Sequence, residues 1–418
     1  MKAQWDLTKQ QSETDNADHS VKVLIGKIKT CLTLGNNGQV SSTLETIFFV
    51  DALFNKMIHN FNLDHDVLFR EFQLSVQNAF RADGLAKPDE ILRNFEEMCK
   101  SHLKNKTNFI LITSISLNSN ILPKRRRLNG NILNFSKNLP KKYLSSRQKL
   151  IETHFPNEKL SSENCYTFIS ISVKAANVQS AYIESMSAID LYRSMWQLQL
   201  RKNMDFFASP DSKKFPSDSI FQLGMVHTLH LSNGKSAWGG LWQEEKPSKI
   251  AVQINDFDDA DKKLGKLLNL FNKKQPEYRK FLYSIFQSYI KALDKPDHEF
   301  RFLKLWLTFE LIMNKDDATS LIKMMSFFYR DSSIDKAVLQ SLRKARNINV
   351  HVGEKQVNIE LKNFQMCSYI EHVLRFFLYN PFKFKKHHEL WDFISSTTDV
   401  SAIDNQIKRL RLVKKFIA

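Results

Sequence analysis

The chain has 418 residues, of which 42% are hydrophobic and 25% charged, and this length and balance predict two or three soluble domains with cores of their own. Its 61 Lys and Arg residues outnumber its 44 Asp and Glu residues, so the formal net charge of +17 favours a polyanionic partner, nucleic acid first and an anionic membrane surface second. The four cysteines are far apart in the sequence, which argues against a disulfide framework or a cysteine-ligated metal site and favours a reducing, cytoplasmic setting.

The first 105 residues are expected to be mostly helical after a polar start. Residues 1–20 lack the apolar core of a secretion signal and are expected to form a flexible arm. Apolar residues then recur at helical spacing, with a Gly-Asn-Asn-Gly turn at residues 35–38. We predict three clear helices in residues 21–105, at 46–61, 66–79 and 87–103. No apolar run approaches the ~20 residues of a membrane-spanning helix, so we expect no membrane partner.

Residues 106–257 are expected to form a small mixed α/β region. A long amphipathic helix is predicted at residues 176–199. Segments rich in β-branched residues predict strands at residues 108–117, 166–173, 226–231 and 249–254. Between the first two strands lies a basic segment that includes Lys124, Arg125, Arg126 and Arg127. We interpret these four residues as a candidate RNA-contacting patch, with a solvated loop as an equal alternative.

From residue 258 to residue 418 the sequence predicts helices almost without interruption. Apolar residues at helical spacing predict seven of them, at residues 258–271, 276–293, 299–313, 317–329, 334–347, 359–378 and 402–417. The predicted fold class is therefore α+β, with a mixed α/β N-terminal region followed by an all-α C-terminal bundle.

One segment of this helical region carries residues suited to RNA cleavage. Arg346 and Asn347 are followed by His351, with four residues between the Arg and the His. RNA can be cut without a metal or a cofactor, because its own 2′-hydroxyl can attack the neighbouring phosphate. That reaction needs a group that moves protons near neutral pH, for which His is best suited, and a fixed cation for the phosphate charge, for which Arg is best suited. The amide of Asn347 can hold either the phosphate or the Arg.

The segment resembles the HEPN superfamily (higher eukaryotes and prokaryotes nucleotide-binding), whose motif is an Arg, a polar residue and a His at the end of a late helix. A helix with Trp306 and Glu310 precedes it, as in ApeA-like members of that family. The resemblance covers about residues 260–400. It implies a metal-independent endoribonuclease that acts in bacterial antiphage defence by abortive infection. It further implies a homodimer through this domain, RNA as the substrate (tRNA being one candidate) and a phage-derived trigger.

The spacing of the motif limits its geometry. Residues five apart on an ideal helix lie ~140° apart around its axis, so Arg346 and His351 of one chain do not share a face of a continuous helix. Either the helix ends near residues 348–350, or the site is shared between two chains. The neighbouring apolar residues suit a dimer surface or, alternatively, an internal core; these are Leu305, Trp306, Phe309, Leu339 and Leu342.

Other interpretations of the motif stay open. Arg346 and His351 suit the capping of a helix C-terminus, and Glu310 suits either an auxiliary role that orients Arg346 or a plain exposed position. The basic residues Arg343 and Lys344 beside the motif are further candidates for RNA contact. The rival function is a non-catalytic RNA-binding or scaffold protein with a degenerate domain of this family.

Overall fold

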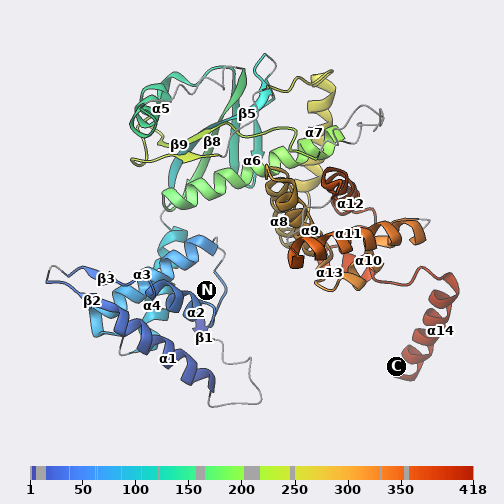
Figure 1. Cartoon of the computed structure of the whole chain (residues 1–418), viewed down its shortest axis with the longest axis horizontal. Helices are drawn as coiled ribbons and strands as arrows, with labels where there is room; N and C mark the ends of the chain where they lie inside the picture. Colours follow the sequence, from blue (N-terminus) through green and yellow to red (C-terminus); the bar gives the residue numbers. More distant parts are fainter. Residues whose placement is uncertain are drawn as a thin grey trace.

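The computed structural model of the chain describes residues 2–5, 16–36, 38–61, 63, 65–85, 87–104, 106–120, 122–156, 165–201, 217–244, 250–329, 332–352 and 357–417. This part of the chain has an α+β fold, which confirms the predicted class: a mixed N-terminal portion with a six-stranded sheet precedes a helical C-terminal portion (Figure 1). None of the helices described is long and apolar enough to cross a bilayer.

The N-terminal elements have a hydrophobic core of their own. They are β1 (Ala3–Trp5), α1 (Asn16–Cys31), β2 (Leu32–Leu34), β3 (Val40–Ser42), α2 (Thr46–Phe54), β4 (Met57–His59), α3 (His65–Asp83) and α4 (Pro88–Lys104). Fully buried Phe72 and Phe95 pack edge to face at the centre of this core. Residues 6–15 lie outside the part of the chain that is described.

Two predictions for these elements were wrong. Residues 1–20 are not all a flexible arm, because β1 pairs antiparallel with β4 and α1 begins at Asn16. The helix predicted at residues 46–61 ends at Phe54, and β4 follows it. The extended conformation of β1 and β4 depends on their pairing with each other across more than fifty residues of sequence. Local periodicity carries no information about such pairing.

The second region is built on one antiparallel sheet in the order β10-β9-β5-β8-β7-β6. Its elements are β5 (Thr107–Asn118), β6 (Arg126–Leu128), β7 (Asn131–Ser136), α5 (Lys141–His154), β8 (Tyr166–Ala175), α6 (Val178–Arg201), β9 (Val226–Leu231) and β10 (Trp242–Gln243). The strand predicted at residues 249–254 is replaced by a single bridge from Val252 to Leu117. The first residue of that segment, Lys249, lies outside the described residues.

The third region is helical. It comprises α7 (Phe257–Asn272), α8 (Pro276–Leu293), α9 (His298–Met313), α10 (Ala318–Ser326), α11 (Ser332–Val352), α12 (Ile359–Tyr379), α13 (His387–Ile394) and α14 (Val400–Ile417). Local signals start several of these helices: Pro276 occupies the first turn of α8, and the carboxylates of Asp297 and Asp317 accept backbone N–H groups at the starts of α9 and α10. Helix α13 was not predicted from the sequence.

Helix α6 joins the sheet to the helical region. It packs on β8 with one face and on α7 and α8 with another, and it runs between the two regions in Figure 1. Its side chains Tyr192 and Trp196 are fully buried in a core that extends from β5 to α13. Because this core is continuous, the sheet and the helices behind it are expected to move as one packed body.

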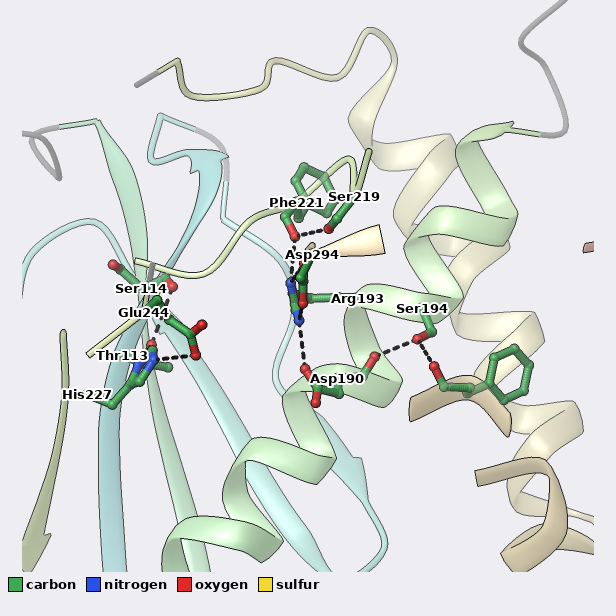
Figure 2. A network of polar contacts seen from close by, with 11 residues as sticks. Thr113, Ser114, Asp190, Arg193, Ser194, Ser219, Phe221, His227, Glu244 and Asp294 are labelled. Atoms are coloured by element: carbon green, nitrogen blue, oxygen red, sulfur yellow. Dashed lines mark hydrogen bonds and ion pairs between the residues drawn. The ribbon is translucent and has the colours of Figure 1, made fainter. Parts of the chain in front are cut away.

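A buried ion-pair network reinforces that junction (Figure 2). Arg193 of α6 donates to both carboxylate oxygens of Asp294 at the end of α8, at 2.9 and 2.7 Å, and to Asp190 at 2.7 Å. It also donates to the carbonyl of Phe221, in the segment that leads to β9. One guanidinium therefore ties together α6, α8 and the entry to the sheet.

We expect Gly234→Ala to destabilise the protein by roughly 1–3 kcal/mol. Gly234 has a φ of +92°, and a Cβ there would lie 2.6 Å from the carbonyl oxygen of Lys142 on α5. The control is Gly239→Ala, where a Cβ would have no atom within 4 Å, and its expected effect is within about 0.5 kcal/mol. Denaturant unfolding compares the two variants, and equal stability would contradict a close α5 contact.

Candidate functional site

Helix α11 carries the motif residues Arg346, Asn347 and His351. Its apolar face, with Leu339, Leu342 and Ala345, is buried against α9 and α10. The helix is continuous to Val352, so the alternative in which it ends near residues 348–350 is wrong. Arg346 and His351 thus lie on one uninterrupted helix, and the side chain of His351 is outside the part of the chain that is described.

The side chain of Arg346 is half-buried and has two polar neighbours. Its Nη2 lies 3.9 Å from Oε1 of Glu310 on α9, and its Nη1 donates to Oδ1 of Asn347 at 3.3 Å. The same Oε1 of Glu310 accepts a 2.6 Å hydrogen bond from the indole Nε1 of Trp306, one turn earlier on α9. The structure therefore brings Trp306, Glu310, Arg346 and Asn347 together across two packed helices.

This arrangement orients a cation without neutralising it fully. An Arg has five N–H donors in a fixed plane, and the contacts with Glu310 and Asn347 are long. The indole hydrogen bond fixes the carboxylate, because Trp306 is only 2% exposed and cannot turn away. A third of the Arg346 side chain (32%) remains accessible, so the guanidinium can meet an anion from solvent.

Arg343 and Lys344 extend the positive charge along α11. Both side chains are exposed, and Arg343 lies one helical turn before Arg346. Neighbouring cations of this kind raise the local concentration of a polyanion.

The basic patch at residues 124–127 lies elsewhere. Lys124, Arg125 and Arg127 are exposed on and beside β6, at the edge of the sheet. Arg126 is different, because its Nη2 is 2.5 Å from Oδ1 of the buried Asp261 and ties β6 to α7. Counting Arg126 among free RNA-contacting cations was wrong; its charge is already paired inside the protein.

The five apolar residues considered for a dimer surface belong to the internal core. Leu305, Trp306, Phe309, Leu339 and Leu342 are each at most 2% exposed, so the alternative of an internal core is the correct one. The accessible apolar side chains of α9 are on its outer face. These are Phe300, Leu307 and Leu311, which recur at helical spacing; Leu307 lies three residues before Glu310 and Leu311 directly after it.

A second polar group, drawn in Figure 2, has the components of a hydroxyl–His–carboxylate array but not the access that catalysis needs. Nδ1 of His227 is 2.7 Å from Oγ1 of Thr113, and its Nε2 is 3.2 Å from Oε1 of Glu244. This contact holds the pKa of the Glu244 carboxyl below its usual value. Thr113 and His227 are both fully buried, so no substrate can reach the hydroxyl, and we interpret the group as structural.

Among the residues described, no three His, Cys, Asp or Glu side chains gather as a metal site would require. Comparisons with protein-family models, with curated proteins and with solved structures found no match to this chain.

Proposed function

We propose that the chain is a metal-independent endoribonuclease of the HEPN class, with Arg346, Asn347 and His351 as its catalytic residues. The observation that carries the proposal is the Trp306–Glu310–Arg346 arrangement. It holds a partly accessible guanidinium in place near the end of α11, on the same helix as His351. An oriented cation and a His are the two groups that phosphate chemistry without a metal requires.

In the proposed reaction the 2′-hydroxyl oxygen attacks the adjacent phosphorus. A His351 imidazole takes the 2′-hydroxyl proton, and the guanidinium of Arg346 stabilises the charge that builds on the phosphate oxygens. The bond from phosphorus to the 5′-oxygen breaks, and that oxygen receives a proton from a second, protonated imidazole. The products are a 2′,3′-cyclic phosphate and a 5′-hydroxyl, so protons and electrons balance with no other reactant.

A shared site between two chains supplies both imidazoles. Since α11 is continuous, Arg346 and His351 of one chain are expected to lie ~140° apart around its axis, which favours a cleft completed by a second α11. The exposed Leu307 and Leu311 next to Glu310 suit the contact surface. The proposed active unit is therefore a homodimer through the helical region.

We expect Arg346→Ala and His351→Ala, each inactive alone, to regain partial activity when they are co-expressed and the mixed dimer is isolated. That dimer keeps one Arg and one His in a single composite cleft, so the guanidinium and one of the two imidazoles remain, and activity should stay below that of the wild type. Leu307→Asp with Leu311→Asp should yield an inactive monomer, because two buried charges in the interface cost several kcal/mol. Light scattering in the presence of RNA provides the check: a wild-type protein that is monomeric while it is active would contradict the shared site.

By the same resemblance, we propose a cytoplasmic effector of antiphage defence that cuts an RNA, tRNA being one candidate, when a phage-derived trigger is present. The regions before α7 would recognise the substrate or the trigger. The Arg193 network and the continuous core support such coupling, because a displacement of the sheet reaches α8 through α6.

The test is cleavage of RNA by purified protein in EDTA. The proposal expects cleavage that is insensitive to the chelator. The rival, a non-catalytic RNA-binding protein, would bind RNA in a salt-sensitive way and leave it intact. Replacing Lys124, Arg125 and Arg127 with Ser separates RNA binding from RNA cleavage, because these side chains are proposed to bind RNA and not to cut it. Arg126 is left unchanged so that its contact with Asp261 is kept.

A further inference from the structure

Helix α14 (Val400–Ile417) contributes nothing to the core. None of its residues is buried, and Figure 1 shows it standing apart from the other helices after a short connection from α13. Its start is nevertheless well defined, because the carboxylate of Asp399 accepts the backbone N–H groups of Ser401 and Ala402. Most of the stability of a helix in a protein comes from packing of its apolar face, so α14 is expected to lie on a surface.

Most of the exposed apolar side chains of α14 lie on one side of its axis, whereas Leu412 and Phe416, which are 69% and 92% exposed, lie on the other side. Six apolar residues fall within an arc of about 140°. They are Val400, Ile403, Ile407, Leu410, Val413 and Ile417, each between 36% and 76% exposed. Lys408, Arg411 and Lys415 lie along one side of this arc, and Lys414 lies within it. Counting Arg409 as well, α14 has five cations against one acid, Asp404.

We propose that α14 is a membrane-surface helix that lies in the interface of an anionic lipid bilayer. Its apolar arc would enter the boundary between headgroups and acyl chains, while its cations contact lipid phosphates. Lys414 does not prevent this, since a lysine stem lies along apolar surface while its ammonium reaches the headgroups. The net charge of +17 adds long-range attraction to the same surface.

RNA and a second copy of α14 are the alternative partners, and each of them suits only some of the side chains of α14. RNA neutralises the cations but leaves the apolar arc in water. A second α14 buries the apolar arc but brings five cations against five, and a parallel pair places Lys414 opposite its own copy in the seam. An anionic bilayer meets both requirements. The expectation of no membrane partner rested on the lack of a spanning segment, which does not bear on a helix that lies flat.

The experiment is co-sedimentation of the full-length protein with two kinds of vesicle, phosphatidylcholine alone and phosphatidylcholine mixed with phosphatidylglycerol. We expect binding to the anionic vesicles only, weakening as salt is added. Replacing Ile407 and Leu410 with Ser should reduce binding by at least about tenfold. Replacing Lys408, Arg411 and Lys415 with Ser should reduce it by about two orders of magnitude, because each contributes about a factor of five.

Asn405→Ala, outside the apolar arc of the same helix, is the matched control and should bind as wild type does. All these variants should unfold at the wild-type temperature, because α14 contributes no buried residue. Wild-type protein that stays in solution with both kinds of vesicle overturns the proposal. So does a mass that falls from dimer to monomer in the Ile407/Leu410 variant without vesicle binding, which would assign α14 to a second copy. Loss of RNA affinity in the Lys408/Arg411/Lys415 variant, with no vesicle binding by wild type, would assign it to RNA.

Discussion

Arg346→Ala and His351→Ala should each lower RNA cleavage by about two to four orders of magnitude, the range that removal of a general acid–base group or of a charge-stabilising donor produces. The first substitution removes the only strong cation that Glu310 and Asn347 orient in the described site. The second removes the group proposed to move protons. Affinity for RNA should change little in either variant, because only one phosphate contact is lost and the rest of the basic surface remains.

Two further variants make this series specific. Lys336→Ala removes an exposed cation from the same helix, and it should cleave RNA as wild type does. Glu310→Gln keeps an acceptor for the Trp306 indole but loses the charge beside Arg346, so we expect RNA cleavage to fall by about tenfold or less.

In a bacterial host, wild-type expression should slow growth, and Arg346→Ala or His351→Ala should relieve that. Variants that fold, cleave and remain toxic would show that the site has been wrongly assigned.

Arg193→Met should lower the free energy of unfolding by about 3–5 kcal/mol, the usual cost of removing one partner from a buried ion pair. Asp190 and Arg193 are 3% and 2% exposed, so water cannot take over the lost hydrogen bonds. Burial raises the pKa of the Asp190 carboxyl, and the Arg193 guanidinium opposes that rise. In Arg193→Met no guanidinium lowers the pKa of Asp190, so this carboxyl is either a buried unpaired charge or protonated.

The pH dependence of the Arg193→Met variant follows from the same change. A carboxyl whose pKa is higher in the folded state than in the unfolded state makes the fold less stable as pH rises through that interval. The stability deficit of the variant should therefore be smaller in mildly acidic solution than at neutral pH. Arg127→Met, the same substitution at an exposed position on β6, is the control and should cost no more than about 0.5 kcal/mol. Equal stability of the two variants in denaturant would contradict a structural role for the Arg193 network.

Much of the helical region could be predicted because its signals are local. Helix α8 was predicted with its observed bounds, Pro276–Leu293, since a proline opens it and apolar residues recur along it. Strand β9 (Val226–Leu231) was likewise predicted at its observed bounds. The three-residue strands β1 and β4 could not be predicted in this way. Their conformation depends on each other, and three residues are too few to show a period.

The candidate site was predictable as a set of residues but not as a surface. Arg346 and Glu310 were named from the motif and from the helix before it, and packing of α11 on α9 places them 3.9 Å apart. Periodicity assigned Leu305 and Leu342 to an apolar face without saying whether the chain itself covers that face, which it does. The pairing of Arg126 with Asp261 joins residues far apart in sequence, so a run of four basic residues gave no sign of it.

The most direct test of the endoribonuclease proposal is sequencing of RNA ends after expression of wild-type and His351→Ala protein in bacteria. Wild-type protein is expected to produce new 5′-hydroxyl ends, each matched by a 2′,3′-cyclic phosphate at the neighbouring nucleotide. Those ends should be missing from cells that make equal amounts of folded His351→Ala protein. New ends that appear equally with both proteins, or that carry a 5′-phosphate and a 3′-hydroxyl, would contradict the proposed chemistry.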